Sequence, residues 1–266
     1  MPLAVCATPI GNLDDVTLRV LDELRAADVV LAEDTRHTRG LLERHGIEAR
    51  LLSYHEHNEA ARVAELIPRL QGGERIALVS DAGLPGISDP GARIVTAALA
   101  AGVPVTVLPG PSAVQTALVA SGLVGERYAF VGFLPRRAGE LAELWRSLGD
   151  WDGAVVAFES PNRLPRSLAS LAAVEPGREV AVCRELTKRF EEIARGAAEE
   201  VARRFETAPK GEITLVLGAR PAVRDDEPAY AAVAELVLAG TPRRAAADVV
   251  ARLTGVPRNE LYRTSL

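Results

Sequence analysis

The stretch IALVSDAGLPGISDPGARIVTAALAAGVPVTVLPGPSA, residues 76–113, decides the fold of this chain. Two short apolar runs, at 76–80 and 105–108, flank a segment at 92–100 whose apolar spacing fits a helix. Strand, helix and strand in that order are typical of a parallel sheet covered by helices on both faces. The stretch therefore predicts an α/β fold.

The same alternation continues in both directions along the chain. Upstream it predicts strands at 3–7, 29–32 and 51–53 and helices at 17–27, 35–45 and 59–70. Downstream it predicts strands near 128–132, 154–158, 180–183 and 213–217, with helices near 113–119, 140–148, 163–172 and 198–205. We expect two α/β domains, the first with a mostly parallel sheet and the second with a mixed sheet.

The domain organisation follows from where these signals change. A chain of 266 residues exceeds one average domain. We expect an N-terminal α/β domain at 1–112, a second α/β domain at 113–220 and a polar, proline-flanked linker at 220–228. Strand signals vanish after the linker, so residues 228–266 are predicted to form a small helical appendage.

Composition excludes several classes of protein. Hydrophobic residues make up 48% of the chain, which is too much for a disordered protein, and the net charge of −5 argues against a nonspecific nucleic-acid coat. Two lone cysteines exclude a cysteine-ligated cluster and fit a reducing compartment. No leader-like N-terminus and no apolar run of about 20 residues is present. We expect a soluble, cytoplasmic protein.

Three predicted strand ends are rich in glycine and proline, at 7–15, 80–91 and 108–113. Ligands of open parallel sheets bind beyond the carboxyl ends of the strands, where glycine lets the backbone approach them closely. Ordinary turns are the alternative, but three such loops in one domain favour a ligand site. Neither GxxxxGK[ST] nor GxGxxG occurs, which excludes a phosphate-binding loop, a dinucleotide fold and the usual Rossmann-type methyltransferase.

These loops and six further segments resemble, in order, the tetrapyrrole methylase (class III) superfamily. The matching segments are 7–19, 32–38, 53–59, 81–91, 109–113, 130–136, 158–164, 184–188 and 210–214. They are most similar to a branch of it that methylates ribosomal RNA. The resemblance implies S-adenosylmethionine in a cleft between the domains, a homodimer, and methylation of a cytidine ribose 2′-hydroxyl in 16S ribosomal RNA or the small ribosomal subunit. It implies no DNA or membrane partner.

The match to the binding loops of the superfamily also implies which residues contact the cofactor. Backbone amides and carbonyls there would hold the adenine and methionine ends. The expected contacts are Pro9, Gly83, Leu84, Ser88, Ser112 and Ala113 from the first domain and Phe133, Glu159 and Ile213 from the second.

Methyl transfer from a sulfonium needs an in-line acceptor and no metal, but a ribose hydroxyl benefits from a base. Asp34 and Arg36 follow the second strand and could take the proton or grip a phosphate, or simply begin a helix. His55 and Asn58 could contact RNA or form a structural hydrogen-bond cluster; a metal site is the alternative, but no third ligand follows at a recognisable spacing. Lys188, one of only two lysines, could bind phosphate, lower the pKa of the hydroxyl or be a solvated strand end.

The C-terminal segment at 241–266 carries five arginines against two carboxylates in a pattern typical of a helix–turn–helix. Arg243, Arg244 and Arg258 are the expected RNA contacts; a helical cap or a dimer contact is the alternative. Two other functions stay open, a methyltransferase of the same fold acting on a tetrapyrrole or other small molecule, and a noncatalytic ribosome-assembly factor. The residues alone identify neither the base, the modified nucleotide nor the choice between free RNA and assembled subunit.

Overall fold

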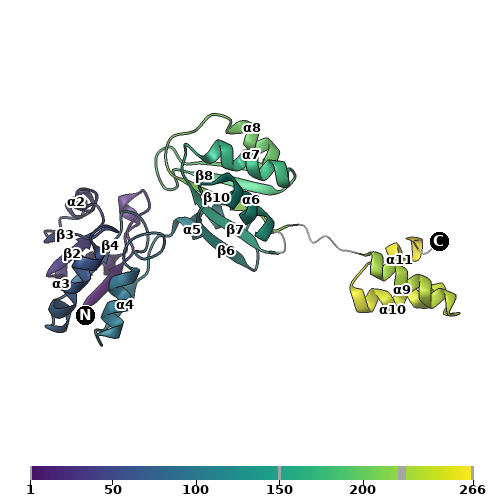
Figure 1. Ribbon diagram of the computed structural model, residues 1–266, viewed down its shortest axis with the longest axis horizontal. Helices are drawn as coiled ribbons and strands as arrows, with labels where there is room; N and C mark the ends of the chain where they lie inside the picture. The colour runs from purple at the N-terminus through teal and green to yellow at the C-terminus, as the bar shows by residue number, and fades with distance from the viewer. Residues whose placement is uncertain (1, 149–150, 221–225, 265–266) are drawn as a thin grey trace. The chain divides into compact units, whose positions relative to one another are not determined.

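The structure, a computed structural model, describes residues 2–148, 151–220 and 226–264 (Figure 1). Contacts divide the chain into two units, Met1–Arg220 and Pro221–Leu266. Unit 1 contains two five-stranded sheets with their helices, and unit 2 is helical. The predicted fold class, two α/β domains and a C-terminal helical segment, is confirmed. In the part of the chain that the structure describes, no helix has the length and apolarity needed to cross a membrane.

The first sheet is entirely parallel, with strand order β3-β2-β4-β1-β5. Its strands are β1 (Leu3–Cys6), β2 (Val29–Ala32), β3 (Leu51–Ser53), β4 (Ile76–Val79) and β5 (Val105–Leu108). Between them run the short helix η1 (Leu13–Asp15) and the helices α1 (Leu18–Ala26), α2 (Thr35–Arg44), α3 (Glu59–Gln71) and α4 (Ala92–Ala100).

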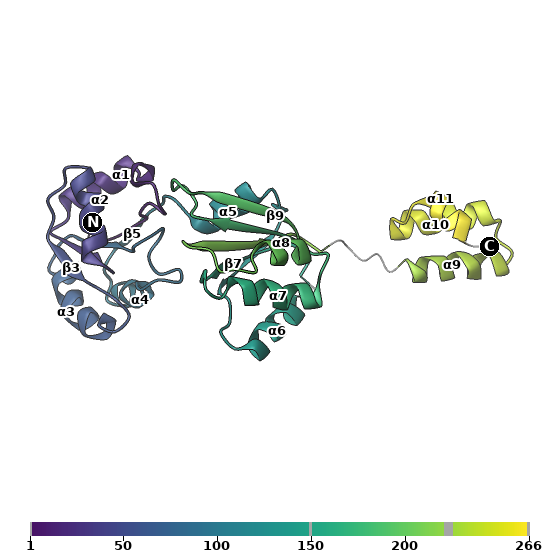
Figure 2. The same cartoon turned by 90° about the horizontal axis from the view of Figure 1, so that it is seen from above.

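Helices cover both faces of the first sheet because its central strands β1, β2 and β4 are apolar at every position. In β1, Leu3 and Val5 pack with α3 and α4, whereas Ala4 and Cys6 pack with α1 and α2 on the opposite face. Figure 2 shows the two helix pairs on opposite sides of the sheet. The sheet is therefore a buried layer whose carboxyl ends alone are available to a ligand.

The second sheet is mixed, in the order β6-β7-β10-β8-β9. Only β6 and β7 pair parallel; the other neighbours are antiparallel. The strands are β6 (Tyr128–Phe133), β7 (Ala154–Glu159), β8 (Glu179–Arg184), β9 (Glu192–Ala197) and β10 (Ile213–Leu217). The helix α5 (Ala113–Ser121) packs on one face, and α6 (Ala138–Ser147), α7 (Leu164–Val174) and α8 (Ala198–Arg204) pack on the other (Figure 2).

Strand β9 is the element that the sequence pattern did not predict. It lies at the edge of the sheet and pairs only with β8. Of its six residues only Ala194 is buried, and the exposed Arg195 donates to the carbonyls of Ser121 and Ala120 at the end of α5. An edge strand with one buried side chain shows no apolar alternation, so hydrophobic patterning could not reveal it.

Unit 2 consists of α9 (Glu227–Leu238), α10 (Arg243–Thr254) and α11 (Arg258–Thr264). These helices share a core of their own, in which Val233, Val250 and Leu261 are buried. Gly255, in the left-handed conformation, ends α10 and allows the short turn to α11. The helical appendage is as predicted; the predicted linker falls largely on residues 221–225, which lie outside the described residues. The subdivision of unit 1 at residues 112/113 and the start of the appendage at 228 stay predictions.

Candidate active site

Unit 1 contains a cavity of about 620 Å³ at the carboxyl ends of the first sheet. The loops that follow β1, β2, β4 and β5 form one wall, and residues of β6, β7, β8 and β10 with their adjoining loops form the other. The volume lies within the range of pockets that enclose a small organic ligand. The cavity therefore occupies the place at which an open parallel sheet is expected to bind its ligand.

Eight of the nine predicted cofactor contacts line this cavity. They are Gly83, Leu84, Ser88, Ser112, Ala113, Phe133, Glu159 and Ile213. Pro9 does not line it; it borders a separate cavity of only about 10 Å³ behind the same loops. The two halves of unit 1 thus contribute the loops that the resemblance indicated, with Pro9 one layer behind them.

The loop after β4 is held in place by the loop after β1. Gly83 and Thr8 form an isolated antiparallel bridge, with Thr8 N donating to Gly83 O at 2.8 Å and Gly83 N to Thr8 O at 3.1 Å. The buried hydroxyl of Thr8 also donates to the carbonyl of Ser80 at 3.0 Å. Gly83 has φ +77° and Ser88 has φ +65°, so the loop uses backbone conformations that only a fixed surrounding would keep.

The N-terminus of α5 opens onto the cavity. The hydroxyl of Ser112 caps the helix by accepting from Gln115 N at 3.4 Å. Ala113, Val114 and Gln115, the first turn of the helix, all line the cavity. Unpaired amides of a first helical turn carry partial positive charge and suit the carboxylate of a ligand.

Glu159 lines the cavity, but its carboxylate is not free to act there. The side chain is fully buried and bound by Arg163, by the backbone N–H of Ser160 and by the hydroxyl of Ser167. Only the main chain of Glu159 is available to a ligand. Its carboxylate instead ties β7 to the start of α7.

Four carboxylates outside the predicted site residues line the cavity: Glu33 after β2, Asp81 and Asp89 in the loop after β4, and Glu212 before β10. Burial, followed by the charges of Glu33 and Asp81, raises the pKa of Asp89 to about 7. Burial and the charge of Asp81 also raise the pKa of Glu33. Such a lining favours a cationic ligand. Asp81 and Asp89 lie in the glycine- and proline-rich loop at 80–91, where the sequence alone does not distinguish them from ordinary turn residues.

Asp34 and Arg36 lie beside the cavity but do not line it. Asp34 caps α2 through Arg36 N at 2.8 Å and pairs with the exposed guanidinium of Arg36, also at 2.8 Å. The hydrogen bonds from Arg36 lower the pKa of Asp34 to about 2, which makes it a weak base. The backbone N–H of Asp34 donates to Asp81 Oδ1 at 3.1 Å, so this segment orients a carboxylate of the cavity.

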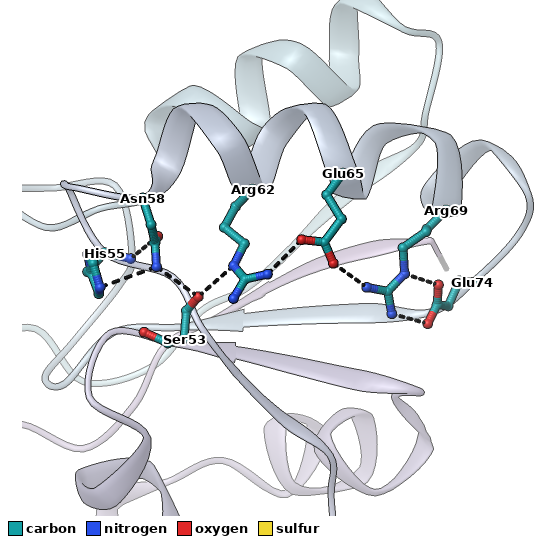
Figure 3. A network of polar contacts seen from close by, with 7 residues as sticks. All are labelled: Ser53, His55, Asn58, Arg62, Glu65, Arg69 and Glu74. Atoms are coloured by element: carbon teal, nitrogen blue, oxygen red, sulfur yellow. Dashed lines mark hydrogen bonds and ion pairs between the residues drawn. The ribbon is translucent and has the colours of Figure 1, made fainter.

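His55 and Asn58 form the predicted pair at the start of α3, also outside the cavity lining. The amide of Asn58 lies 3.2 Å from His55 Nε2 and also donates to the carbonyl of Ser53. His55 Nδ1 is buried without a hydrogen-bond partner. Figure 3 shows the network continuing along α3 through Arg62 and Glu65. The pair therefore anchors the end of β3 to the helix.

Lys188 sits in an ion-pair cluster at the rim of the cavity. Its Nζ lies 3.0 Å from Glu185 Oε1 and 2.9 Å from Glu212 Oε2. Burial works against the charged form, but the bonds to Glu212 and Glu185 outweigh it and raise the pKa of Lys188. The lysine is thus a fixed cation that fastens the loop after β8 to Glu212, which itself lines the cavity.

The arginines selected in unit 2 differ in their surroundings. The guanidinium of Arg243 stacks over the ring of Tyr262, with its central carbon 4.7 Å from the ring centroid. Arg258 pairs with Asp248 at 2.6 Å, whereas Arg244 is exposed on α10. Arg244 is the most accessible of the three to a partner.

Metal and thiol chemistry find no support in the described residues. They contain no group of three His, Cys, Asp or Glu side chains that could hold a metal ion. Cys183 lines the cavity, but burial raises its pKa to about 11 and keeps it a thiol. The remaining lining combines carboxylates, the hydroxyl and amide side chains of Ser88, Ser112, Gln115, Ser160 and Thr214, backbone and apolar groups, which suits binding and proton transfer.

Comparison with known proteins adds the identity of the family. Residues 2–202 match the model of the Tetrapyrrole (Corrin/Porphyrin) Methylases, and residues 224–266 match that of the RsmI C-terminal HTH domain. The chain belongs to the tetrapyrrole methylase family. The predicted resemblance is confirmed, and this family member is a methyltransferase.

Two relatives of this tetrapyrrole methylase share its full length. The chain is 45% identical to the ribosomal RNA small subunit methyltransferase I of Mesorhizobium japonicum, covering 99% of the chain and 91% of the relative. It is 40% identical to the protein of the same name from Escherichia coli O157:H7, covering 99% and 94%. The chain thus falls in the branch that carries this name.

Solved structures with lower identity show the same fold. The methyltransferase CobJ superposes with a TM-score of 0.63 at 21% identity, covering 82% of this chain and 94% of its own. A uroporphyrin-III C-methyltransferase from Thermus thermophilus, solved with S-adenosylhomocysteine, has a TM-score of 0.58 at 19% identity, covering 81% and 96%. The expectation of S-adenosylmethionine as the cofactor agrees with the family and with that complex.

Proposed function

We propose that this tetrapyrrole methylase transfers the methyl group of S-adenosylmethionine to the ribose 2′-hydroxyl of a cytidine in 16S ribosomal RNA. The observation that carries the proposal is the cavity of unit 1, in which the matching loops of both halves converge on one ligand-sized space. The names of its full-length relatives support ribosomal RNA of the small subunit as the acceptor. The choice of the ribose 2′-oxygen and of a cytidine is implied by the resemblance and is part of this proposal.

The residues of the cavity fit S-adenosylmethionine. Phe133, Phe158 and Ile213 offer apolar surface for a purine, and the first turn of α5 offers amides for a carboxylate. The carboxylates of Asp81 and Asp89 complement its positive charges. When bound, the cofactor supplies a methyl group on a cationic sulfur.

Proton transfer is assigned to Asp89 in this proposal. The ribose hydroxyl becomes nucleophilic as its proton leaves, and a base whose pKa lies near the working pH serves this best. Asp89 has a pKa raised to about 7 and lines the cavity, whereas Asp34 has a pKa of about 2 and does not. Asp89 would accept the proton while the new carbon–oxygen bond forms. Arg36, His55 and Lys188 are proposed as positioning residues around it.

The quaternary state and location belong to the same proposal. The resemblance implies a homodimer that works in the cytoplasm on the small ribosomal subunit or its RNA. Light scattering on the purified chain measures the mass of the particle directly. A monomer at all concentrations would remove the dimer from the proposal without affecting the reaction.

The decisive experiment supplies labelled S-adenosylmethionine and small ribosomal subunits that lack native methylation. The product is digested and the label located by mass spectrometry. Label on the 2′-oxygen of one cytidine is expected. A protein that binds the cofactor but labels no RNA would shift the proposal to a tetrapyrrole or other small-molecule acceptor, and a protein that binds no cofactor would contradict it altogether.

A further inference from the structure

The loop at 185–191, which joins β8 to β9, displays an aromatic side chain to solvent. Phe190 is 65% exposed. Of the five phenylalanines in the chain only Phe190 and Phe133 are more than half exposed, and Phe133 lines the cavity. A single exposed apolar side chain is common on protein surfaces, so the surroundings of Phe190 on this loop decide whether it could contact a ligand.

The loop that carries Phe190 is fixed by hydrogen bonds and by an unusual backbone. Glu185 and Thr187 have φ of +52° and +65°, a conformation that residues other than glycine seldom adopt. Thr187 N donates to Glu191 Oε2 at 2.6 Å, and Glu191 N donates to the carbonyl of Lys188 at 3.1 Å. Phe190 is therefore presented on an ordered turn.

The same loop borders the cavity. Leu186 and Glu212 line the cavity, and Lys188 bonds Glu212 at 2.9 Å. On its other side, Thr187 Oγ1 accepts from the backbone N–H of Asn12 at 3.0 Å, in the loop that follows β1. Phe190 does not line the cavity, but it comes two residues after Lys188 on this same loop, whose residue Leu186 does.

Arg189 completes the exposed surface with a positive charge. Its guanidinium carbon lies 5.5 Å from the centroid of the Phe190 ring. The neighbouring cations are neutralised, Arg184 by Glu192 and Lys188 by Glu185 and Glu212. Among the described residues Arg189 has no carboxylate within ion-pair distance, so its charge is available to an anion.

We propose that Phe190 and Arg189 form a contact for single-stranded RNA at the mouth of the cavity, with a nucleobase stacked on Phe190 and a phosphate beside Arg189. An aromatic ring next to an arginine suits a base and its phosphate together. The inference rests on the proposed RNA acceptor and adds where the strand is held. A stacked base there would position the neighbouring ribose toward the cavity.

The test compares Phe190→Ala, Phe190→Trp and Arg189→Gln with the unaltered chain. Leu99→Ala is the matched control, since Leu99 is 60% exposed at the end of α4 and does not line the cavity. Affinity is measured by fluorescence anisotropy with a labelled single-stranded RNA fragment that contains the acceptor site, and by the KM of methylation on small subunits. S-adenosylhomocysteine binding by calorimetry reports the cavity itself.

Phe190→Ala is expected to weaken RNA binding and to raise the KM by about tenfold, within the range for loss of one base stacked on one ring. Phe190→Trp should retain both values, and Arg189→Gln should weaken binding less and flatten its dependence on salt. The Leu99→Ala control and the affinity for S-adenosylhomocysteine should not change.

Unchanged RNA affinity and KM in Phe190→Ala would overturn the inference and leave the proposed function intact. A loss confined to assembled subunits, with free RNA bound normally, would assign the surface to a ribosomal protein and also overturn it. If the unaltered chain methylates no RNA but binds the fragment through Phe190, the proposed function fails and the RNA contact stands. If it neither methylates nor binds RNA, both fail.

Discussion

At the scale of single residues, Asp89 is held in a protonation state that an exposed aspartate would not adopt at neutral pH. Burial and the charges of Glu33 and Asp81 disfavour its ionised form and raise its pKa to about 7. A group with this property titrates near neutral pH, so it makes stability depend on pH there and, in the proposed function, catalysis as well.

We expect the methylation rate to rise with pH through about 7, because the ionised form of Asp89 accepts the proton. Asp89→Asn cannot accept it and should lower kcat by roughly 10²–10⁴ and remove this rise. A pH profile of single-turnover methylation measures both effects. A profile of unchanged shape in Asp89→Asn would show that another group takes the proton.

The free energy of unfolding should change with pH in the direction opposite to the methylation rate. A raised pKa means that Asp89 favours folding when protonated, so its contribution is fully present below the pKa of the unfolded chain and is lost as the pH rises through about 7. Asp89→Asn should therefore raise Tm at pH 8 by roughly 2–4 °C, equivalent to about 1 kcal/mol after allowance for solvent screening. The difference should shrink as the pH falls to 4. A variant less stable than the parent at pH 8 would contradict the assignment of buried charge.

The residue scale is also where sequence reasoning was least complete. Asp34 is a candidate base in the sequence because it follows a predicted strand. In the structure its side chain caps α2 and binds Arg36. Asp81, which shares the cavity with Asp89, was read as part of a turn. Both residues follow a strand, and only the three-dimensional path of each loop decides which carboxylate enters the cavity.

At the scale of elements, the loop at 185–191 meets the loop after β1 at Gly11 and Asn12. A methyl group added to Gly11 would lie 2.5 Å from Lys188 Cγ, 2.7 Å from Thr187 Oγ1 and 2.8 Å from the carbonyl oxygen of Leu186. No side chain fits between the two loops without moving one of them. This approach connects the two halves of unit 1 beside the cavity.

Gly11→Ala should destabilise the chain by about 1–3 kcal/mol, as other overpacked sites do, and should weaken RNA binding because the loop with Phe190 is displaced. Gly40→Ala is the control: Gly40 lies in α2 with nothing within 4 Å of the added carbon, and alanine there should stabilise by roughly 0.5–1 kcal/mol. Urea denaturation of both variants measures the two changes. Equal effects of the two substitutions would argue against the close contact.

Element positions followed closely from apolar periodicity where the strands are buried. The strands at 29–32 and 213–217, which are buried at every position, have the predicted bounds, since buried strands of a parallel or central position are continuous apolar runs. Strand β9 was not predicted because it lies at the edge of the second sheet and only one of its six residues is buried. The apolar pattern in the sequence therefore predicts buried strands better than exposed ones.

At the scale of the whole molecule, the chain consists of two units that each have a core. The core of unit 2 is built from its own three helices, and the residues that line the cavity, between Ile10 and Thr214, belong to unit 1. Cofactor binding and any contribution of unit 2 to RNA docking can accordingly be separated by deletion.

Deletion of residues 228–266 should leave S-adenosylmethionine binding unchanged and weaken methylation of small subunits. The arginines of unit 2, among them the exposed Arg244, supply the positive charge that the deletion removes. Calorimetry and KM on subunits measure the two functions. Full activity of the shortened chain would assign unit 2 a role outside the reaction.

Apolar periodicity predicts the arrangement of the whole molecule less well than it predicts single helices and strands. The fold class and the helical appendage followed from the order of elements, but the meeting of Ile10 with α5 in one apolar cluster depends on contacts between distant segments. Such contacts leave no local pattern in sequence. The strand ends of the first sheet predict the position of the cavity, whereas the contribution of the second sheet to its lining was implied only by the resemblance.

The two cysteines of the chain give each sheet its own intrinsic reporter. Cys6 lies in β1 and Cys183 in β8; both are buried, and burial raises the pKa of each thiol. Both side chains are at most 1% exposed, so we expect alkylation of Cys6 to require local opening of β1 and that of Cys183 to require opening of β8 or of the cavity that it lines. Timed alkylation followed by peptide mass spectrometry would therefore give a separate opening rate for each sheet. A ligand in the cavity should slow modification of Cys183 more than that of Cys6, and equal rates under all conditions would mean that the two sheets open as one cooperative body.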